Sequence, residues 1–169
     1  VLALPALIDA FGVPGGGYTM SNSGAFGIDA ERWRQVPETS TRVINMNRLG
    51  DVLTGTPVPP VKVLFVYNSN ALVTSPDQNL IQKGLEREDL FTVVFDQVRT
   101  DTSRYADVIL PATTFLEHYD IARAYGNYAV QLVKPVIEPV GESRPNVVVF
   151  SELAARLGVG SEEDETDVL

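Results

Sequence analysis

The chain has 169 residues, 44% of them hydrophobic, which is enough for one folded domain with an apolar core. Its 13 Lys and Arg against 22 Asp and Glu give a net charge of -9, which argues against a surface for the DNA or RNA backbone. The absence of cysteine excludes, within this chain, a disulfide framework, a thiolate zinc site, a cysteine-held iron–sulfur cluster and a cysteine nucleophile. No apolar stretch approaches the roughly 20 residues of a membrane-spanning helix. We therefore expect neither a nucleic-acid partner nor insertion into a membrane.

The two ends of the chain suggest a piece of something longer. The first residue is Val1 rather than Met, and the basic start of a signal peptide is missing. Ser161–Leu169 carries five acidic side chains and no basic one, so residues 159–169 are predicted to form a solvated or disordered tail. We interpret the chain as a segment of a larger polypeptide. Its compartment stays open between the cytoplasm, which we favour, and the periplasm.

The first 60 residues predict little regular structure. Val1–Phe11 is apolar enough for a short helix that begins near Pro5, because proline fits only the first turn. Gly12–Gly17 contains three adjacent glycines, which permit positive φ, but it matches neither glycine-rich nucleotide pattern. Ile28–Pro60 has no sustained period and contains four prolines. We expect residues 1–60 to form a glycine-rich loop and a long connection.

Residues 61–158 predict alternating strands and helices. Val61–Tyr67 is an apolar run, and Phe91–Phe95 lacks alternation, as is typical of a strand covered on both faces of a parallel sheet. Between them Ser75 is expected to cap a helix over Pro76–Arg87, with a stripe of Leu80, Ile81 and Leu85 and with Gly84 close to the sheet. Such a crossover favours a right-handed parallel unit. The fold class is therefore α/β, a three-layer parallel-sheet domain of the dinucleotide-binding type, incomplete in this chain.

Four shorter elements follow in the predicted order. Thr100–Thr102 is expected to cap a helical turn through Tyr105, and Asp107–Leu110 to form a third strand that Pro111 terminates. Tyr128–Val133 alternates as an edge strand would. Ser143 or Asn146 is expected to cap a last helix, which Gly158 stops. The apolar face of that helix would consist of Phe150, Leu153, Ala154 and Leu157.

Polar residues follow the first two strands at the position where open α/β sheets bind nucleotides. Asn68, Ser69 and Asn70 come after the first strand, and Asp96 with Gln97 after the second. Asp96 is well placed to accept hydrogen bonds from ribose hydroxyls or a guanine edge. The alternatives are that the Asn residues close a turn and that Asp96 caps the next turn through Thr100 or Thr102.

Glu117, His118, Tyr119 and Asp120 place an acid, a base and a phenol together, which suggests acid–base chemistry or a metal site. Adjacent residues on a helix point in different directions, so a surface pair is the favoured interpretation. A Ser/His/Asp hydrolase is disfavoured because G-x-S-x-G is missing.

Asp96–Glu117 closely resembles the molybdopterin oxidoreductase family, in particular the dimethyl sulfoxide reductase and formate dehydrogenase group. The resemblance covers about residues 1–158 and is loose over Asp29–Pro60. It also includes Gly12–Gly17, Val63–Asn70, the helix start at Pro76-Asp77 and Gly141–Asn146.

The resemblance implies a segment of an oxidoreductase catalytic subunit in which dithiolenes of two pterin guanine dinucleotides hold molybdenum or tungsten. By the same resemblance, Asn68, Ser69 and Asn70 would line the phosphate or ribose, and Asp96 with Gln97 would meet ribose or guanine. Thr100 and Thr102 would organise the adjoining loop. The metal ligand and all catalytic residues would lie elsewhere in the parent, so the chain alone is expected to bind no cofactor and to be inactive.

The resemblance further implies that the remaining domains of the parent chain are partners, together with iron–sulfur electron-transfer subunits. Two alternatives stay open. One is an independent NAD-type domain, which the missing G-x-G-x-x-G disfavours. The other is a non-catalytic scaffold homologue of the family. The substrate and the choice between molybdenum and tungsten lie outside what this stretch encodes.

Overall fold

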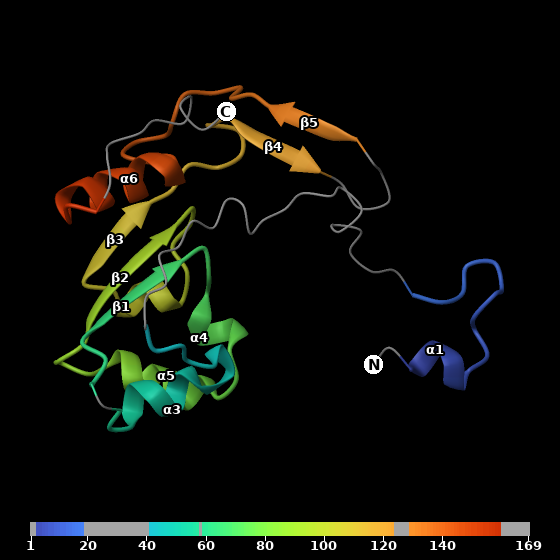
Figure 1. The fold of residues 1–169 in the computed structure, drawn as a ribbon, viewed down its shortest axis with the longest axis horizontal. Coiled ribbons are helices and arrows are strands. Elements are labelled where there is room, and N and C mark those ends of the chain that lie inside the picture. Colours follow the sequence, from blue (N-terminus) through green and yellow to red (C-terminus); the bar gives the residue numbers. More distant parts are fainter. Residues whose placement is uncertain (1–2, 19–40, 58, 124–128, 160–169) are drawn as a thin grey trace. The chain divides into compact units, whose positions relative to one another are not determined.

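A computed structural model describes residues 3–18, 41–57, 59–123 and 129–159 (Figure 1). The chain divides into two compact units, Val1–Thr39 with Ile121–Gln131, and Ser40–Asp120 with Leu132–Leu169. The acidic tail predicted for residues 159–169 lies outside the described residues except at its first position. The division of the chain into segments 1–60, 61–158 and 159–169, which was drawn from the sequence, stays a prediction. None of the helices in the described ranges could cross a membrane.

The first unit contains little regular structure. Helix α1 (Leu4–Leu7) has Pro5 in its first turn, as expected. In the loop that follows, Gly12, Gly15 and Gly17 have φ of 77°, 77° and 87°, which explains the glycines there. Strands β4 (Asp120–Arg123) and β5 (Val130–Val133) form a two-stranded sheet, of which residues 121–123 and 130–131 belong to this unit. The predicted strand at Tyr128–Val133 therefore begins at Val130, and residue 128 lies outside the described ranges.

The second unit is built on a parallel sheet, which confirms the predicted α/β class. Strands β1 (Val63–Tyr67), β2 (Phe91–Asp96) and β3 (Val108–Pro111) lie in the order β1-β2-β3. Val63 pairs with Phe91, and Val93 pairs with Val108. Because all three strands run the same way, their carboxyl ends meet at one edge of the sheet.

Helices cover both faces of this sheet. One face packs against α3 (Leu49–Thr54), α4 (Ala71–Thr74) and α5 (Gln78–Leu85). The other face packs against α6 (Asn146–Arg156) through Phe95, Ala112 and Val149. Figure 1 shows α3 and α5 on one side of the sheet and α6 on the other. The three-layer arrangement is as predicted.

The cover over the α6 face is partial. Val63, Phe65 and Phe91 lie on it and are 62%, 37% and 48% exposed. The ring of Phe150 on α6 approaches Phe65 to 5.8 Å but leaves the amino-terminal part of this face uncovered. A parallel sheet is normally covered on both faces, so these exposed apolar side chains are unusual.

Helix α5 begins later than predicted. Its N-cap is Asp77, at φ 59°, whose side chain accepts a hydrogen bond from the Leu80 amide at 3.1 Å. Ser75 is instead the extended residue that ends α4, a conformation favoured before Pro76. Gly84 was expected to approach the sheet, but a Cβ there would overlap the Leu53 side chain of α3. The glycine therefore serves the contact between two helices.

Helix α6 also differs from the prediction at its start. Its N-cap is Pro145, and no side chain caps it. Val149 is the buried residue of its sheet-facing side, whereas Leu157 is 75% exposed. The predicted stop at Gly158 is confirmed, because Gly158 has φ of 71° and the amide of Val159 donates to the Ala154 carbonyl at 2.9 Å.

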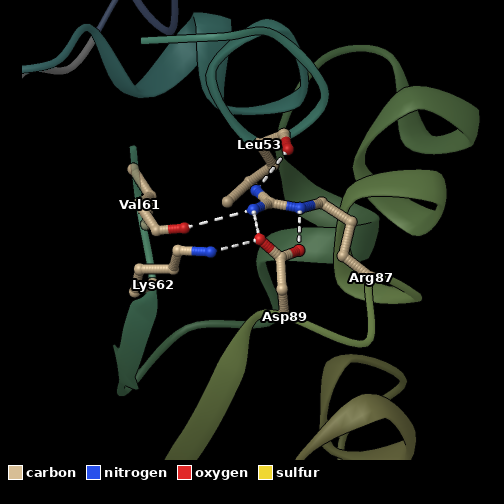
Figure 2. Close-up of polar contacts among 5 residues, drawn as sticks. All are labelled: Leu53, Val61, Lys62, Arg87 and Asp89. Atoms are coloured by element: carbon tan, nitrogen blue, oxygen red, sulfur yellow. Dashed lines mark hydrogen bonds and ion pairs between the residues drawn. The ribbon is translucent and has the colours of Figure 1, made fainter. Parts of the chain in front are cut away.

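A charged network of Lys62, Arg87 and Asp89 lies at the amino-terminal end of the sheet (Figure 2). The Arg87 guanidinium donates to the carbonyls of Leu53 at 2.7 Å and Val61 at 3.4 Å. It also forms two hydrogen bonds with the Asp89 carboxylate, at 2.9 and 2.8 Å, and Lys62 Nζ lies 2.6 Å from the same carboxylate. One side chain thus ties α3, the start of β1 and the turn before β2 together.

Candidate functional site

The turn after β1 holds exposed polar side chains in a strained backbone. Asn68 has φ of 48°, a left-handed conformation that Asn tolerates better than most residues. Its amide donates to the Phe95 carbonyl at 3.1 Å, which fixes the turn against β2. The side chains of Asn68 and Ser69 are exposed and make no hydrogen bond within the described part of the chain. Both are free to meet a ligand.

Asn70 points inward and connects two loops. Its Oδ1 accepts hydrogen bonds from the Thr102 amide at 3.3 Å and the Thr102 hydroxyl at 2.9 Å, while Nδ2 donates to Asp101 at 3.3 Å. Thr102 is fully buried, and its hydroxyl accepts from the Leu72 amide at 3.0 Å. The pair therefore holds α4 against the 3-10 helix η3 (Thr102–Tyr105). This geometry suits a positioning role for Asn70 and Thr102.

Thr100 lies two residues before the first residue of the same 3-10 helix. Its hydroxyl accepts from the Ser103 amide at 3.3 Å, so the expected capping of this turn comes from Thr100. The Asp96 side chain takes no part in this capping, since its one hydrogen bond to a described residue runs from the Gln97 amide to Oδ1 at 2.7 Å.

Asp96 and Gln97 offer polar atoms at the end of β2. Asp96 is half-buried, and its Oδ2 has no hydrogen-bond partner among the described residues. Gln97 is exposed, and its Nε2 donates to the Thr113 carbonyl at 3.2 Å. This bond joins the ends of β2 and β3. A carboxylate with one free oxygen beside a held carboxamide can accept and donate hydrogen bonds to a sugar or a base.

Glu117 organises the loop after β3. The sequence did not predict that this acid is buried. It is 5% exposed, and its carboxylate accepts from the Thr114 amide and hydroxyl at 2.6 and 2.7 Å and from the Val140 amide at 2.7 Å. These bonds, that of the Thr114 hydroxyl first, lower the pKa of Glu117 from 4.5 to about 2. The pattern Thr-x-x-Glu at Thr114–Glu117, typical of a capping box, was the signal that could have found it.

The neighbouring side chains diverge, as expected for adjacent residues. His118 Nδ1 lies 2.9 Å from the Thr113 hydroxyl, and Nε2 lies 4.0 Å from the Asp120 carboxylate. Glu117 points instead at the Thr114 and Val140 amides. Within the described ranges, no three His, Cys, Asp or Glu side chains form a group that could hold a metal ion.

Two hollows lie elsewhere on the second unit. One of about 430 Å³ is lined by residues between Val43 and Pro57, and one of about 300 Å³ lies between β3 and α6 around Arg144 and Glu152. Neither includes any of the seven predicted site residues. The candidate site therefore lies outside both hollows.

Comparisons with known proteins agree with this fold. The chain is 40% identical to the probable oxidoreductase YoaE of Bacillus subtilis over its whole length, and it covers 25% of that protein. It is 29% identical to the dimethyl sulfoxide/trimethylamine N-oxide reductase of Cereibacter sphaeroides, with 98% of this chain and 24% of the relative covered. The chain thus spans about a quarter of the length of these curated relatives.

A solved structure supports the same relationship. Acetylene hydratase from Pelobacter acetylenicus matches 69% of this chain and 16% of its own, with a TM-score of 0.60 and 30% sequence identity. The sequence profile of the molybdopterin oxidoreductase family matches residues 17–156. This chain therefore belongs to the molybdopterin oxidoreductase family.

Proposed function

We propose that this chain is the molybdopterin guanine dinucleotide-binding segment of a molybdenum or tungsten oxidoreductase and is inactive alone. Membership of the family implies a molybdopterin cofactor in the full-length relatives. The observation that carries the guanine dinucleotide form is the half-buried Asp96, whose Oδ2 has no hydrogen-bond partner among the described residues. A carboxylate in that position suits ribose hydroxyls or the N–H edge of guanine.

The donor set at the carboxyl edge fits a nucleotide. Asp96 supplies an acceptor, and Gln97, Ser69 and Asn68 supply exposed groups that both donate and accept. Asn70, Thr100 and Thr102 would act behind them by fixing the loops. When bound, the cofactor would supply a metal held by dithiolenes for redox chemistry. The residues of this chain would bind and orient its nucleotide end.

The proposal is tested with the full-length parent prepared without cofactor, by measuring GDP binding calorimetrically. Asp96→Asn removes a charge-assisted hydrogen bond and should weaken GDP binding by about tenfold or more. Glu88→Gln is the matched control, because it removes one exposed acid at the opposite end of the sheet and should leave the affinity unchanged. Equal affinities for wild type and Asp96→Asn would contradict the assignment of Asp96.

A second test addresses the cofactor itself. The parent protein purified from cells in which molybdenum cofactor synthesis is blocked should be inactive. Activity retained under that block would refute cofactor dependence and would favour the NAD-type alternative, which measurable NADH binding would then support.

The remaining domains of the parent chain are the proposed partner of this segment. The relatives are about four times as long as the chain, and Val63, Phe65 and Phe91 expose an apolar surface on the α6 face. Covering such a surface is what parallel sheets require. Hydrogen-exchange mass spectrometry of the parent should show β1 and β2 more protected than in the isolated segment. Equal protection would argue that nothing in the parent packs there.

A further inference from the structure

Thr113 is a buried junction between three parts of the second unit. It is 2% exposed, and its amide donates to the Arg144 carbonyl at 3.2 Å. Its hydroxyl meets His118 Nδ1 at 2.9 Å, and its carbonyl accepts from Gln97 Nε2 at 3.2 Å. Every polar group of this residue is therefore engaged, and each one by a different segment. A displacement of Thr113 would therefore alter its hydrogen bond with the Gln97 side chain, which follows the end of β2.

His118 is the side chain that fixes the Thr113 hydroxyl. It is 15% exposed, and its Nε2 faces the Asp120 carboxylate at 4.0 Å. In the tautomer with its proton on Nε2, which faces that carboxylate, Nδ1 would accept a hydrogen bond from the Thr113 hydroxyl. The imidazole thereby fixes the side-chain rotamer of Thr113, whose hydroxyl is buried away from bulk solvent.

We infer that His118 is a positioning residue for the nucleotide, acting through Thr113 on the Gln97 carboxamide. This inference rests on the proposed function, in which Gln97 meets ribose or guanine. Gln97 is exposed, so its long side chain would sample several rotamers unless the Thr113 carbonyl held it. Holding it before binding removes part of the entropy loss that ordering a flexible side chain imposes on association. His118 would thus raise affinity without touching the ligand.

The test is a double-mutant cycle on GDP binding to the cofactor-free full-length parent. Gln97→Ala should weaken binding by about fivefold to tenfold, the value of one hydrogen bond to a polar ligand. His118→Ala should weaken it by about threefold to fivefold. The double variant should be no weaker than Gln97→Ala alone, because His118 has nothing left to position.

Two further variants separate positioning from a loss of folding. His118→Asn places an amide oxygen near the position of Nδ1 and should restore affinity to within about twofold of wild type. Thr113→Val keeps the shape but removes the hydroxyl, so it should match His118→Ala. Hydrogen exchange of the peptide around Gln97 should rise in His118→Ala and return to the wild-type rate in His118→Asn. A merely structural histidine would not show this coupling to Gln97.

The outcomes are distinguishable. Effects of His118→Ala and Gln97→Ala that multiply in the double variant overturn this inference and leave the proposed function standing. A Gln97→Ala variant with wild-type affinity overturns the inference together with the nucleotide contact assigned to Gln97. Failure of the wild-type parent to bind GDP overturns both the inference and the proposed function. Recovery by His118→Asn, with no added loss in the double variant, supports the positioning role.

Discussion

The two ends of the β1-β2-β3 sheet use their polar side chains in opposite ways. At the amino-terminal end, the Arg87 guanidinium bonds to two carbonyls and a carboxylate, and Lys62 joins the same carboxylate (Figure 2). At the carboxyl end, Asp96 Oδ2 and the side chains of Asn68 and Ser69 have no partner among the described residues. The amino-terminal end satisfies these polar groups within the protein, whereas the carboxyl end keeps several of its polar atoms without a partner among the described residues, and we propose that these atoms meet a ligand.

The difference shows which residues stabilise the unit and which are available for chemistry. Arg87, and Lys62 after it, hold the pKa of Asp89 well below its usual range, so the carboxylate stays ionised further into the acidic range than a free Asp does. Bidentate pairing of this kind fixes geometry as well as charge. Substitutions at the amino end should therefore alter stability, whereas substitutions at the exposed carboxyl edge should alter binding.

The largest stability effect is expected from Gly84→Ala at the amino end. The added Cβ would overlap Leu53, and forcing α3 away should cost about 1–3 kcal/mol, which exceeds the gain in helix propensity. Native-state hydrogen exchange of β2 peptides in the parent measures this directly. Lys83→Ala on the exposed side of the same helix is the control and should change stability by under about 0.5 kcal/mol. An unchanged exchange rate in Gly84→Ala would mean that α3 does not pack there.

A smaller loss is expected from Arg87→Met. The variant keeps the apolar stem but leaves the Leu53 and Val61 carbonyls and the Asp89 carboxylate without their donor. The loss is moderated because 22% of the Arg87 side chain is already exposed to solvent. Exchange should rise at the end of α3 and the start of β1, while GDP affinity should stay within about twofold of wild type. A large drop in affinity with unchanged exchange would reverse the comparison between the two ends.

A third effect depends on pH and concerns Glu117 at the carboxyl end. Its pKa is about 2 in the folded protein against 4.5 for the free group, so the folded state favours the ionised form. This contribution to stability is complete above pH 4.5 and is lost as the pH falls from 4.5 towards 2. Glu117→Gln should reduce the pH dependence of the unfolding free energy between pH 4.5 and 2. It should also raise amide hydrogen exchange in the loop after β3. A wild-type slope that survives the substitution would assign the acid sensitivity to other carboxyls.

The fold was largely predictable because its signals are local. The apolar runs form β1 and β2 themselves, and Gly158 directly follows the last turn of α6. The predicted bounds of these two strands differ from the observed ones by two residues at most. Helix α3 escaped prediction because its six residues include Gly50 and Thr54, and packing of Leu53 rather than intrinsic propensity stabilises it.

The internal roles of the site residues could not be predicted from the sequence. Asn70 and Thr102 are 32 positions apart, and Arg87 is 34 positions from Leu53, so no window of sequence contains both partners. An Asn after a strand can contact a ligand or connect two loops, and in the structure Asn70 connects loops through Thr102 and Asp101. The sequence does not distinguish these two roles. The position of Asp96 at the end of an apolar strand, by contrast, could be recognised in the sequence itself.

The smallest stability effect, and the sharpest contrast with Gly84→Ala, is expected from Asn68→Gly. Glycine adopts φ near 48° without the steric cost that a side chain incurs, so the unit should be unchanged or more stable by no more than about 1 kcal/mol. The exposed carboxamide is lost, so GDP affinity of the cofactor-free parent should fall by about threefold to fivefold. Asn68→Asp keeps the tolerance for positive φ and an acceptor, but its negative charge should weaken binding of a phosphate more strongly than Gly does. Binding weakened equally by both would place the phosphates away from this turn, whereas tighter binding by Asn68→Asp would place the guanine N–H edge there instead.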